Sequence, residues 1–361
     1  MKYHNLDIDE LCSFEKKIFE ACGLSVEDSR RAANVLMHAD LRGLDSHGVI
    51  NLGQIYVPKL LNGEINISPR FRNVVDTSSI CVMDGDNGLG LLTAQIAMDI
   101  AIEKAREAGC GIVCVRNSTH FGSAGYYAMQ ATTENMIGIA MTNTGNKGLI
   151  RPPGGVQKLI GTNPISIAAP TRDVPPFLLD MSTAVASEGK VRITRMKEEL
   201  VPGGWVVDQS GIPINDFTYN LEQDYFLQFL GSQMNTAVFK GFGLAIAVEM
   251  FCGLLSGAGV GPECISLADS NRSQNIGHFL MAIDIGKFID PKLFQDRLDD
   301  MLKTLVNSIR YKEDQGISYP GWNGESVAKN RSRFGIPVCD QVYRSMGQLS
   351  QKFTIPLPKP Q

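Results

Sequence analysis

The chain lacks the features that mark nucleic-acid-binding, membrane-bound and secreted proteins. Its formal charge at pH 7 is −4, and no run of like charges offers a surface for nucleic acid or for an anionic membrane. No apolar run approaches the ~18 residues of a transmembrane helix, and the polar N-terminus has neither the basic start nor the apolar core of a signal peptide. We therefore expect a cytoplasmic protein whose partner is a small molecule.

Cysteines with a functional spacing are also absent. The eight cysteines form no CxxC pair and no repeated spacing. Cys110 and Cys114 belong to a Gly-Ile-Val-Cys-Val run that is typical of a buried strand, where a thiol behaves as a small apolar group. The pattern predicts neither disulfides nor a metal site.

A glycine-rich dinucleotide loop is missing too. Gly85-Asp86-Asn87-Gly88-Leu89-Gly90 follows an expected strand and precedes an expected helix, but its spacing is the reverse of the dinucleotide fingerprint. No acidic residue ends a second strand about 20 residues later. Gly257-Ala258-Gly259-Val260-Gly261 follows a helix instead of a strand. A nucleotide site of the Rossmann type is therefore not expected.

Apolar periodicity separates the chain into helical ends and an α/β middle. Residues 7–40 and 291–311 repeat apolar positions at helical spacing. Between them a helix over 92–108 is flanked by short β-rich runs, and residues 244–255 are apolar on nearly every face, which predicts a buried helix. The expected strands cover residues 80–83, 111–115, 137–141, 165–169, 177–179 and 279–285.

A chain of this length exceeds the size of a single core, so two structural units are expected. We predict an α/β fold of mixed α+β character. A helical domain would be formed by both chain ends, residues 1–72 and 290–361. The inserted α/β domain would span residues 73–289.

Two of the five histidines lie in short polar motifs that end in glycine. The motifs are Asp45-Ser46-His47-Gly48 and Asn117-Ser118-Thr119-His120-Phe121-Gly122. Histidine has the side-chain pKa closest to neutrality, and glycine lets backbone or ligand approach closely, so the motifs suit proton transfer to a small molecule. Two hydrogen-bonded structural histidines are the alternative interpretation.

Four further polar segments join small or polar residues to strand ends. Hydroxyls, amides and one lysine in these segments could hold phosphates and an amide-bearing ring. Each could also be an ordinary turn or helix cap, and the third is the best candidate for a cap. The segments are Thr142-Asn143-Thr144, Gly161-Thr162-Asn163-Pro164, Asp180-Met181-Ser182-Thr183 and Phe239-Lys240-Gly241-Phe242-Gly243.

Six ordered motifs resemble those of the malate/L-lactate/ureidoglycolate dehydrogenase family, NAD(P)-dependent oxidoreductases unrelated to Rossmann-type lactate and malate dehydrogenases. The resemblance extends over nearly the whole chain. The motifs are Ala39 to Val49, Asn117 to Gly122, Gly161 to Pro164, Leu179 to Thr183, Lys240 to Ala245 and Gly277 to Asp284.

The resemblance implies a fold, a cofactor and a division of roles. The fold would be a helical domain built from both ends plus a non-Rossmann α/β domain that binds NAD, with NADP possible, in a homodimer. His120 would act as the base toward a 2-hydroxyl, with His47 orienting or sharing the proton and Ser46 facing the substrate. The cofactor contacts implied are Ser123, Asn143, Thr162, Asp180, Met181, Ser182, Thr183, Phe239 and Lys240.

One departure from the family pattern concerns the substrate. Many relatives have an arginine four residues after the first histidine, which clamps the substrate carboxylate, whereas this chain has Asn51. Arg42 and Lys147 are candidate replacements. The leading hypothesis is a 2-hydroxy-acid dehydrogenase of the malate/lactate type. The alternatives are a cyclic imine-acid reductase or ureidoglycolate dehydrogenase, and a catalytically silent nucleotide-binding protein.

Overall fold

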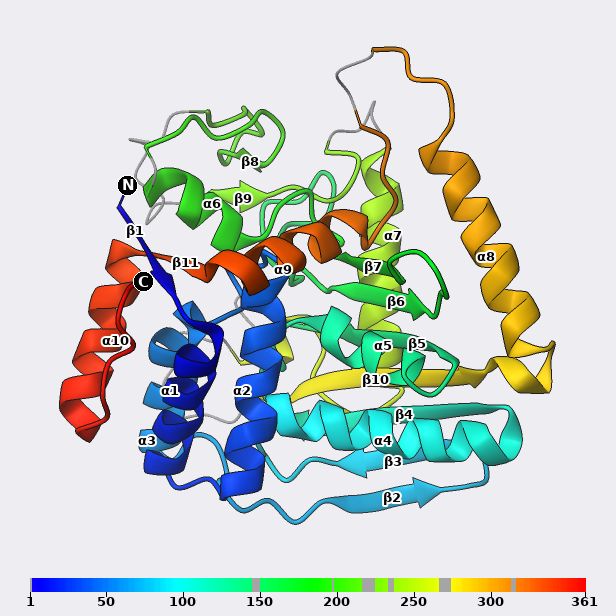
Figure 1. The fold of residues 1–361 in the computed structure, drawn as a ribbon, viewed down its shortest axis with the longest axis horizontal. Coiled ribbons are helices and arrows are strands. Elements are labelled where there is room, and N and C mark those ends of the chain that lie inside the picture. The colour runs from blue at the N-terminus through cyan, green and yellow to red at the C-terminus, as the bar shows by residue number, and fades with distance from the viewer. Residues whose placement is uncertain are drawn as a thin grey trace.

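A seven-stranded mixed sheet forms the centre of the molecule (Figure 1). The computed structural model describes residues 2–144, 150–196, 198–215, 225–232, 237–265, 274–312 and 316–361. Across these residues β3 and β4 are the only parallel neighbours of the sheet. The strands in spatial order are β2 (Arg72–Asp76), β3 (Ile80–Asp84), β4 (Cys110–Ser118), β10 (Ile276–Asp284), β5 (Met136–Thr142), β6 (Ile165–Ala169) and β7 (Phe177–Met181).

This topology gathers several predicted site segments at one edge of the sheet. Because β10 is antiparallel to both β4 and β5, the carboxyl ends of β4 and β5 lie at the same edge. The antiparallel β6 begins there and β7 ends there, with Ile165 paired with both Met141 and Met181. The connections that carry His120, Asn143, Thr162 and Ser182 therefore start or end at this edge.

Helices cover both faces of the sheet. On one face α4 (Gly90–Ala108) and α5 (Ala124–Thr132) pack on the strands, and α2 (Val26–Leu41) lies over them with α1 (Ile8–Ala21) beside it (Figure 1). On the other face α7 (Val238–Val248) continues into a π-helical turn, η3 (Glu249–Leu254), which packs on β4, β5 and β10. Apolar side chains of the strands alternate between these two cores.

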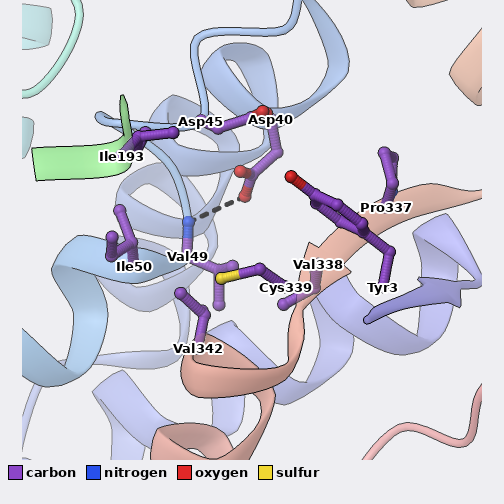
Figure 2. Close-up of a pocket in the computed structure, with 10 residues that line it drawn as sticks. All are labelled: Tyr3, Asp40, Asp45, Val49, Ile50, Ile193, Pro337, Val338, Cys339 and Val342. Atoms are coloured by element: carbon purple, nitrogen blue, oxygen red, sulfur yellow. Dashed lines mark hydrogen bonds between the residues drawn. The ribbon is translucent and has the colours of Figure 1, made fainter. Parts of the chain in front are cut away.

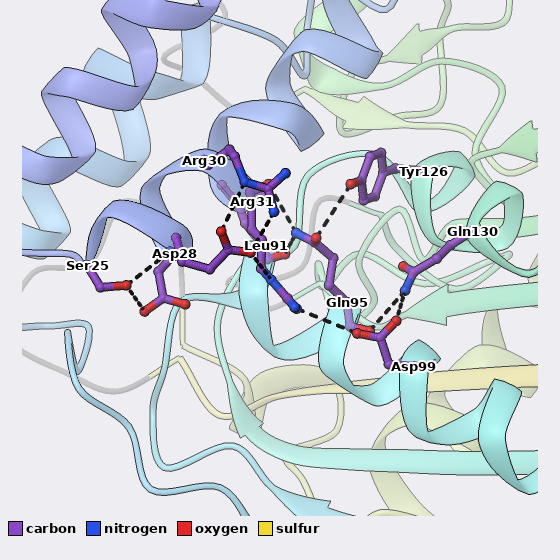
Figure 3. A network of polar contacts seen from close by, with 10 residues as sticks. Ser25, Asp28, Arg30, Arg31, Leu91, Gln95, Asp99, Tyr126 and Gln130 are labelled. Carbon is purple, nitrogen blue, oxygen red and sulfur yellow. Dashed lines mark hydrogen bonds and ion pairs between the residues drawn. The ribbon is translucent and has the colours of Figure 1, made fainter.

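A polar network ties α2 to α4 and α5 (Figure 3). Gln95 of α4 donates to the carbonyls of Leu91 at 2.8 Å and Arg31 at 3.1 Å. Arg31 also pairs with Asp99 at 3.5 Å. The chain leaves α2 toward His47 and enters α5 from His120, so the network fixes the two helices that flank the histidine motifs.

The chain ends join next to the first helices. The short β1 (Tyr3–Leu6) pairs with β11 (Ile336–Cys339), and α9 (Trp322–Phe334) and α10 (Asp340–Phe353) pack against α2 and α1. In contrast, α8 (Pro291–Val306) lies at the side of the sheet, where Asp299 accepts from the Asp173 N–H at 2.7 Å. The division at residues 72 and 290 stays a prediction.

The remaining elements are short. They are the π-helical turn η1 (Leu52–Tyr56), α3 (Val57–Leu61), α6 (Glu188–Met196), the strand pair β8 (Val206–Val207) and β9 (Phe226–Leu227), and the single turns η4 (Gly261–Glu263) and η5 (Ile285–Lys287). A small separate core lies under α6, β8 and β9. None of the described helices has both the length and the apolar character needed to cross a membrane.

The predicted mixed α/β class, the helix over 92–108 and the six strands are confirmed, and the sheet is not of the parallel Rossmann kind. The predicted burial of residues 244–255 is wrong for the single chain. Leu254 and Leu255 are 66% and 57% exposed, because only one side of this helix meets the sheet.

Candidate active site

His120 lies on the connection between β4 and α5, and neighbouring polar contacts fix that connection. The Thr119 hydroxyl accepts from the Gly90 N–H at 2.8 Å, which ties the loop to the first turn of α4. The His120 N–H donates to Gln274 Oε1 at 2.9 Å. The backbone that presents the imidazole is therefore held from two sides.

His47 lies on the tight turn that follows α2. Its N–H donates to the Leu44 carbonyl at 2.8 Å, and its Nδ1 lies 2.8 Å from the Ser46 hydroxyl. The Asn51 amide donates to the Ser46 carbonyl at 3.1 Å. Asn51 is 3% exposed, so its side chain supports the turn from inside the protein.

Glycine is required in both motifs. A Cβ added to Gly48 would lie 1.8 Å from the carboxylate of Asp40, which accepts the Val49 N–H at 2.8 Å. Gly122 has a φ of 78°, and its added Cβ would lie 2.9 Å from Leu91. The glycine that ends each motif thus allows the close packing that positions the histidine.

The structure brings the two histidines together. Their rings stack with centroids 6.1 Å apart and planes 23° apart. Nδ1 of His120 lies 2.9 Å from the Tyr56 hydroxyl and 3.3 Å from the Gly122 nitrogen. Among the described residues neither Nε2 has a hydrogen-bond partner. Each imidazole is therefore fixed through Nδ1 and offers Nε2 to a ligand.

Both histidines are neutral at pH 7. Burial, with smaller contributions from the neighbouring His47 and His278, lowers the pKa of His120 to about 3. Burial also lowers the pKa of His47 to about 4, helped by the positive charges of Arg192 and Lys190. An imidazole in this state can accept a proton, as a general base must.

Asp180 and Ser123, both predicted cofactor contacts, interact with each other. The Asp180 carboxylate accepts from the Ser123 hydroxyl and from the Gly125 N–H, each at 3.0 Å, at the N-terminus of α5. Burial raises the pKa of Asp180, and the bond from Ser123 opposes that rise. Asp180 therefore caps a helix, as the cap interpretation of its segment predicted. The capped helix is α5, which follows His120.

A buried carboxylate that the sequence analysis missed joins three segments on the sheet edge. Glu249 accepts from the Asn143 amide at 3.1 Å, the Asn163 amide at 2.9 Å and the Gly261 N–H at 3.2 Å. The Asn143 oxygen accepts from the Gly277 N–H at 2.9 Å. The side chain of Asn143, a predicted cofactor contact, thus makes its bonds within the protein.

The other predicted cofactor residues fall into two groups. The Thr162 carbonyl accepts from the hydroxyls of Ser182 at 2.8 Å and Thr183 at 3.0 Å, which joins β7 to the segment before β6, and Met181 is half-buried. Phe239 and Lys240 are exposed in the first turn of α7, which has no side-chain cap. Lys240 has no ion-pair partner among the described residues.

Arg42 and Lys147 were the two predicted replacements for the missing substrate-binding arginine. Arg42 donates to Glu325 at 3.1 Å and to the Gly321 carbonyl at 3.3 Å, so its guanidinium is engaged with α9. Lys147 lies outside the described residues. The cations that lower the pKa of His47 are instead Arg192 and Lys190 of α6, which sequence reasoning did not consider.

A small cavity lies behind the first motif (Figure 2). Its lining includes Asp40, Val49, Ile193 of α6 and Cys339 of β11, but neither histidine. Its volume of about 40 Å³ is far below the several hundred Å³ of a substrate pocket. The cavity therefore belongs to the packing that supports the motif. In the part of the chain that is described, no cluster of His, Cys, Asp or Glu could hold a metal ion.

Comparison with known proteins assigns the family. A family model for malate/L-lactate dehydrogenase matches residues 6–347. The chain belongs to the malate/L-lactate dehydrogenase family. It is 37% identical to a malate dehydrogenase of Pyrococcus abyssi, covering 97% of this chain and 95% of the relative. It is also 37% identical to an L-sulfolactate dehydrogenase of Methanocaldococcus jannaschii, covering 92% of each chain.

Solved structures agree with this family assignment. The crystal structure of malate dehydrogenase from Entamoeba histolytica matches with a TM-score of 0.93 at 30% identity, over 99% of this chain and 100% of that chain. As the sequence predicted, this member of the malate/L-lactate dehydrogenase family is an oxidoreductase that uses a nicotinamide cofactor and acts on the CH–OH group of a hydroxy acid. The alternative activities are not favoured by these relatives.

Proposed function

We propose that the chain interconverts a 2-hydroxy acid of the malate/lactate type and its 2-oxo acid, with NAD as cofactor and NADP as a possible second one. The observation that carries this proposal is the stacked pair of neutral histidines, each with Nδ1 fixed and Nε2 free. The test is nicotinamide absorbance with NADH or NADPH and a panel that contains oxaloacetate, pyruvate and a cyclic imine acid. Turnover of a 2-oxo acid supports the proposal, and turnover of the imine alone contradicts it.

His120 is the base in this proposal. Its Nε2 accepts the proton of the substrate hydroxyl as the acid is oxidised, and the Tyr56 hydroxyl holds Nδ1. For Nε2 to accept a proton, Nδ1 must carry the ring proton, and the Tyr56 hydroxyl can accept from Nδ1 both before and after the transfer. His47, held by Ser46, lies close enough to orient the hydroxyl or share the proton.

The nicotinamide, when bound, supplies the acceptor or donor of hydride. Lys240 fits a role in holding it, because this exposed lysine has no ion-pair partner among the described residues and stands in the first turn of α7, whose N-terminus has no side-chain cap and suits a phosphate. Phe239 and Met181 would add apolar contacts. We assign Ser123, Asn143, Thr162, Asp180, Ser182 and Thr183 to shaping the same edge, because their bonds join its segments.

The low pKa of His120 predicts different pH profiles for the two directions. A pKa of about 3 means that the free base predominates at every pH above 4, so kcat/KM for hydroxy-acid oxidation should show no histidine limb between pH 5 and pH 8. Reduction needs the protonated ring, which becomes tenfold rarer with each pH unit, so log kcat/KM should fall with a slope near −1. Initial rates at constant ionic strength test this. A limb near pH 6.5 in oxidation would contradict it.

A homodimer is the assembly we propose. Exposed apolar residues line one side of α7 and η3, with Ile246, Met250 and Leu254 each four positions apart, as expected for a helix face that meets a partner. These residues are Phe239, Leu244, Ile246, Met250, Phe251, Leu254 and Leu255. The cytoplasmic location stays a prediction.

Light scattering tests the dimer. The wild type should have twice the 39.4 kDa mass of the chain, and Leu254→Glu should shift it toward the monomer because a buried unpaired carboxylate opposes association. Leu200→Glu is the matched control, since Leu200 is 70% exposed but lies outside this face. A monomeric wild type, or a dimer that both variants leave intact, would overturn the proposed interface.

A further inference from the structure

An anionic substrate needs a positive partner that the two histidines do not supply. A 2-hydroxy acid carries a carboxylate next to the reacting carbon, and both imidazoles are neutral at pH 7. A carboxylate that leaves water to lie against these buried side chains is stabilised best by a charged hydrogen-bond donor. This inference rests on the proposed function and asks which side chain is that donor.

The side chains nearest in sequence to the first motif are already engaged. The Asn51 amide is buried and donates to the Ser46 carbonyl. The Arg42 guanidinium pairs with Glu325 and with a backbone carbonyl. Neither group is available to a substrate without breaking contacts that hold the turn and α9 in place.

The helix α6 brings a different set of cations to the motif. A Cβ added to Gly189 would lie 2.6 Å from Cβ of Ser46, so the first turn of α6 touches the residue before His47. Ile193, one turn later, lines the same cavity as Asp45 and Val49 (Figure 2). Residues 189 and 193 thus mark the face of α6 that meets the motif.

Helical spacing places Arg192 beside that face. At about 100° per residue, Arg192 lies about 60° from Gly189 and Lys190 lies about 60° from Ile193, so one cation stands on each side of the face. Arg192 is exposed and has neither a hydrogen bond nor an ion-pair partner among the described residues. Burial is the main cause of the lowered pKa of His47, and Arg192 makes the largest contribution of any charged side chain.

We propose that Arg192 binds the substrate carboxylate and so orients the 2-hydroxyl toward the two histidines. A guanidinium offers two parallel N–H donors that match a carboxylate, which an amide at position 51 cannot. The arginine that fixes the acid thus comes from α6, which follows β7, instead of from the first motif.

Steady-state kinetics of Arg192→Met, compared with Lys190→Met, test this assignment. Because a charged pair of hydrogen bonds is lost, KM for both malate and lactate should rise about 10- to 100-fold in Arg192→Met. The Kd for NADH should not change, and Arg192→Lys should restore part of the affinity. Lys190→Met removes the same charge from the same helix and should raise KM less than about threefold.

Binding of oxalate, an unreactive dianion, gives a readout that does not depend on turnover. The NMR signal of the His47 ring should shift on addition of oxalate to the NADH-loaded wild type, and Arg192→Met should weaken that binding at least tenfold. Equal effects of Arg192→Met and Lys190→Met, or unchanged oxalate affinity in Arg192→Met, would overturn the inference. A wild type that binds oxalate through Arg192 but turns over no acid would instead refute the proposed function.

Discussion

His120→Ala is expected to lower kcat by about 10²- to 10⁴-fold while the Kd for NADH stays unchanged. The side chain is the one whose free Nε2 and fixed Nδ1 suit proton transfer, and its removal leaves the substrate hydroxyl without a positioned base. The expected effect lies in kcat because the contact strengthens as the proton moves. Rates from pre-steady-state mixing and NADH fluorescence titration would measure the two quantities separately.

Two variants separate proton transfer from packing. Tyr56→Phe keeps the ring and removes the hydroxyl 2.9 Å from Nδ1, so kcat should fall about tenfold while the slope of the reduction profile stays near −1. His47→Ala should lower kcat less than His120→Ala does. If His120→Ala keeps the wild-type rate, or if His47→Ala is the more damaging change, the assignment of the base is wrong.

Glu249→Ala should reduce the free energy of unfolding by about 2–4 kcal/mol, because three buried hydrogen bonds to one acceptor are lost. The change leaves the Gly261 N–H without an acceptor and removes one of the bonds of the Asn143 and Asn163 amides, which keep their bonds to the Gly259 and Ala245 carbonyls. Because these groups join the ends of β5 and β6 to the turn after η3, the affinity for NADH should fall as well. Urea unfolding followed by circular dichroism measures the stability loss.

Glu249→Gln and Glu107→Ala complete that experiment. Glutamine keeps the shape of the side chain but directs its own N–H groups at other donors. The loss in free energy of unfolding should therefore lie between that of the wild type and that of Glu249→Ala. Glu107 is exposed on α4, and its replacement should change stability by less than about 0.5 kcal/mol. An unfolding midpoint of Glu249→Ala equal to that of the wild type would show that the carboxylate does not hold the edge together.

Local patterns of sequence were sufficient for most of the elements. The strand at Cys110–Ser118 and the helix at Gly90–Ala108 were predictable from the spacing of their apolar residues. Each element buries apolar side chains, and their spacing in the sequence is typical of a strand or of a helix. The convergence of His47 and His120 was suggested by shared motif chemistry and by family resemblance. It could not be derived from spacing, since the contact depends on how α2 lies over α4 and α5.

The supporting contacts were harder to predict because their partners are distant in sequence. Asp180 caps α5, whose first residue is more than fifty positions earlier, and Tyr56 reaches His120 from the π-helical turn η1. Glu249 did leave a signal, as a single carboxylate in the apolar run from Leu244 to Leu255. A lone charge in such a run indicates a buried polar network.

The same run shows why burial is difficult to infer from hydrophobicity alone. Residues 244–255 are apolar all round, yet the single chain covers only the side that packs on β4, β5 and β10. An apolar residue that meets a second copy of the chain and one that meets its own sheet leave the same pattern in the sequence. The exposed face therefore becomes the basis of the proposed dimer.

The most direct test of the account is a crystal structure of the chain with NADH and oxamate, an unreactive 2-oxo-acid analogue. We predict that the 2-oxo oxygen of oxamate lies within ~3.2 Å of Nε2 of His120, with the His47 ring beside it. Oxamate bound at a place that neither imidazole reaches would contradict the central claim that these two histidines share one substrate.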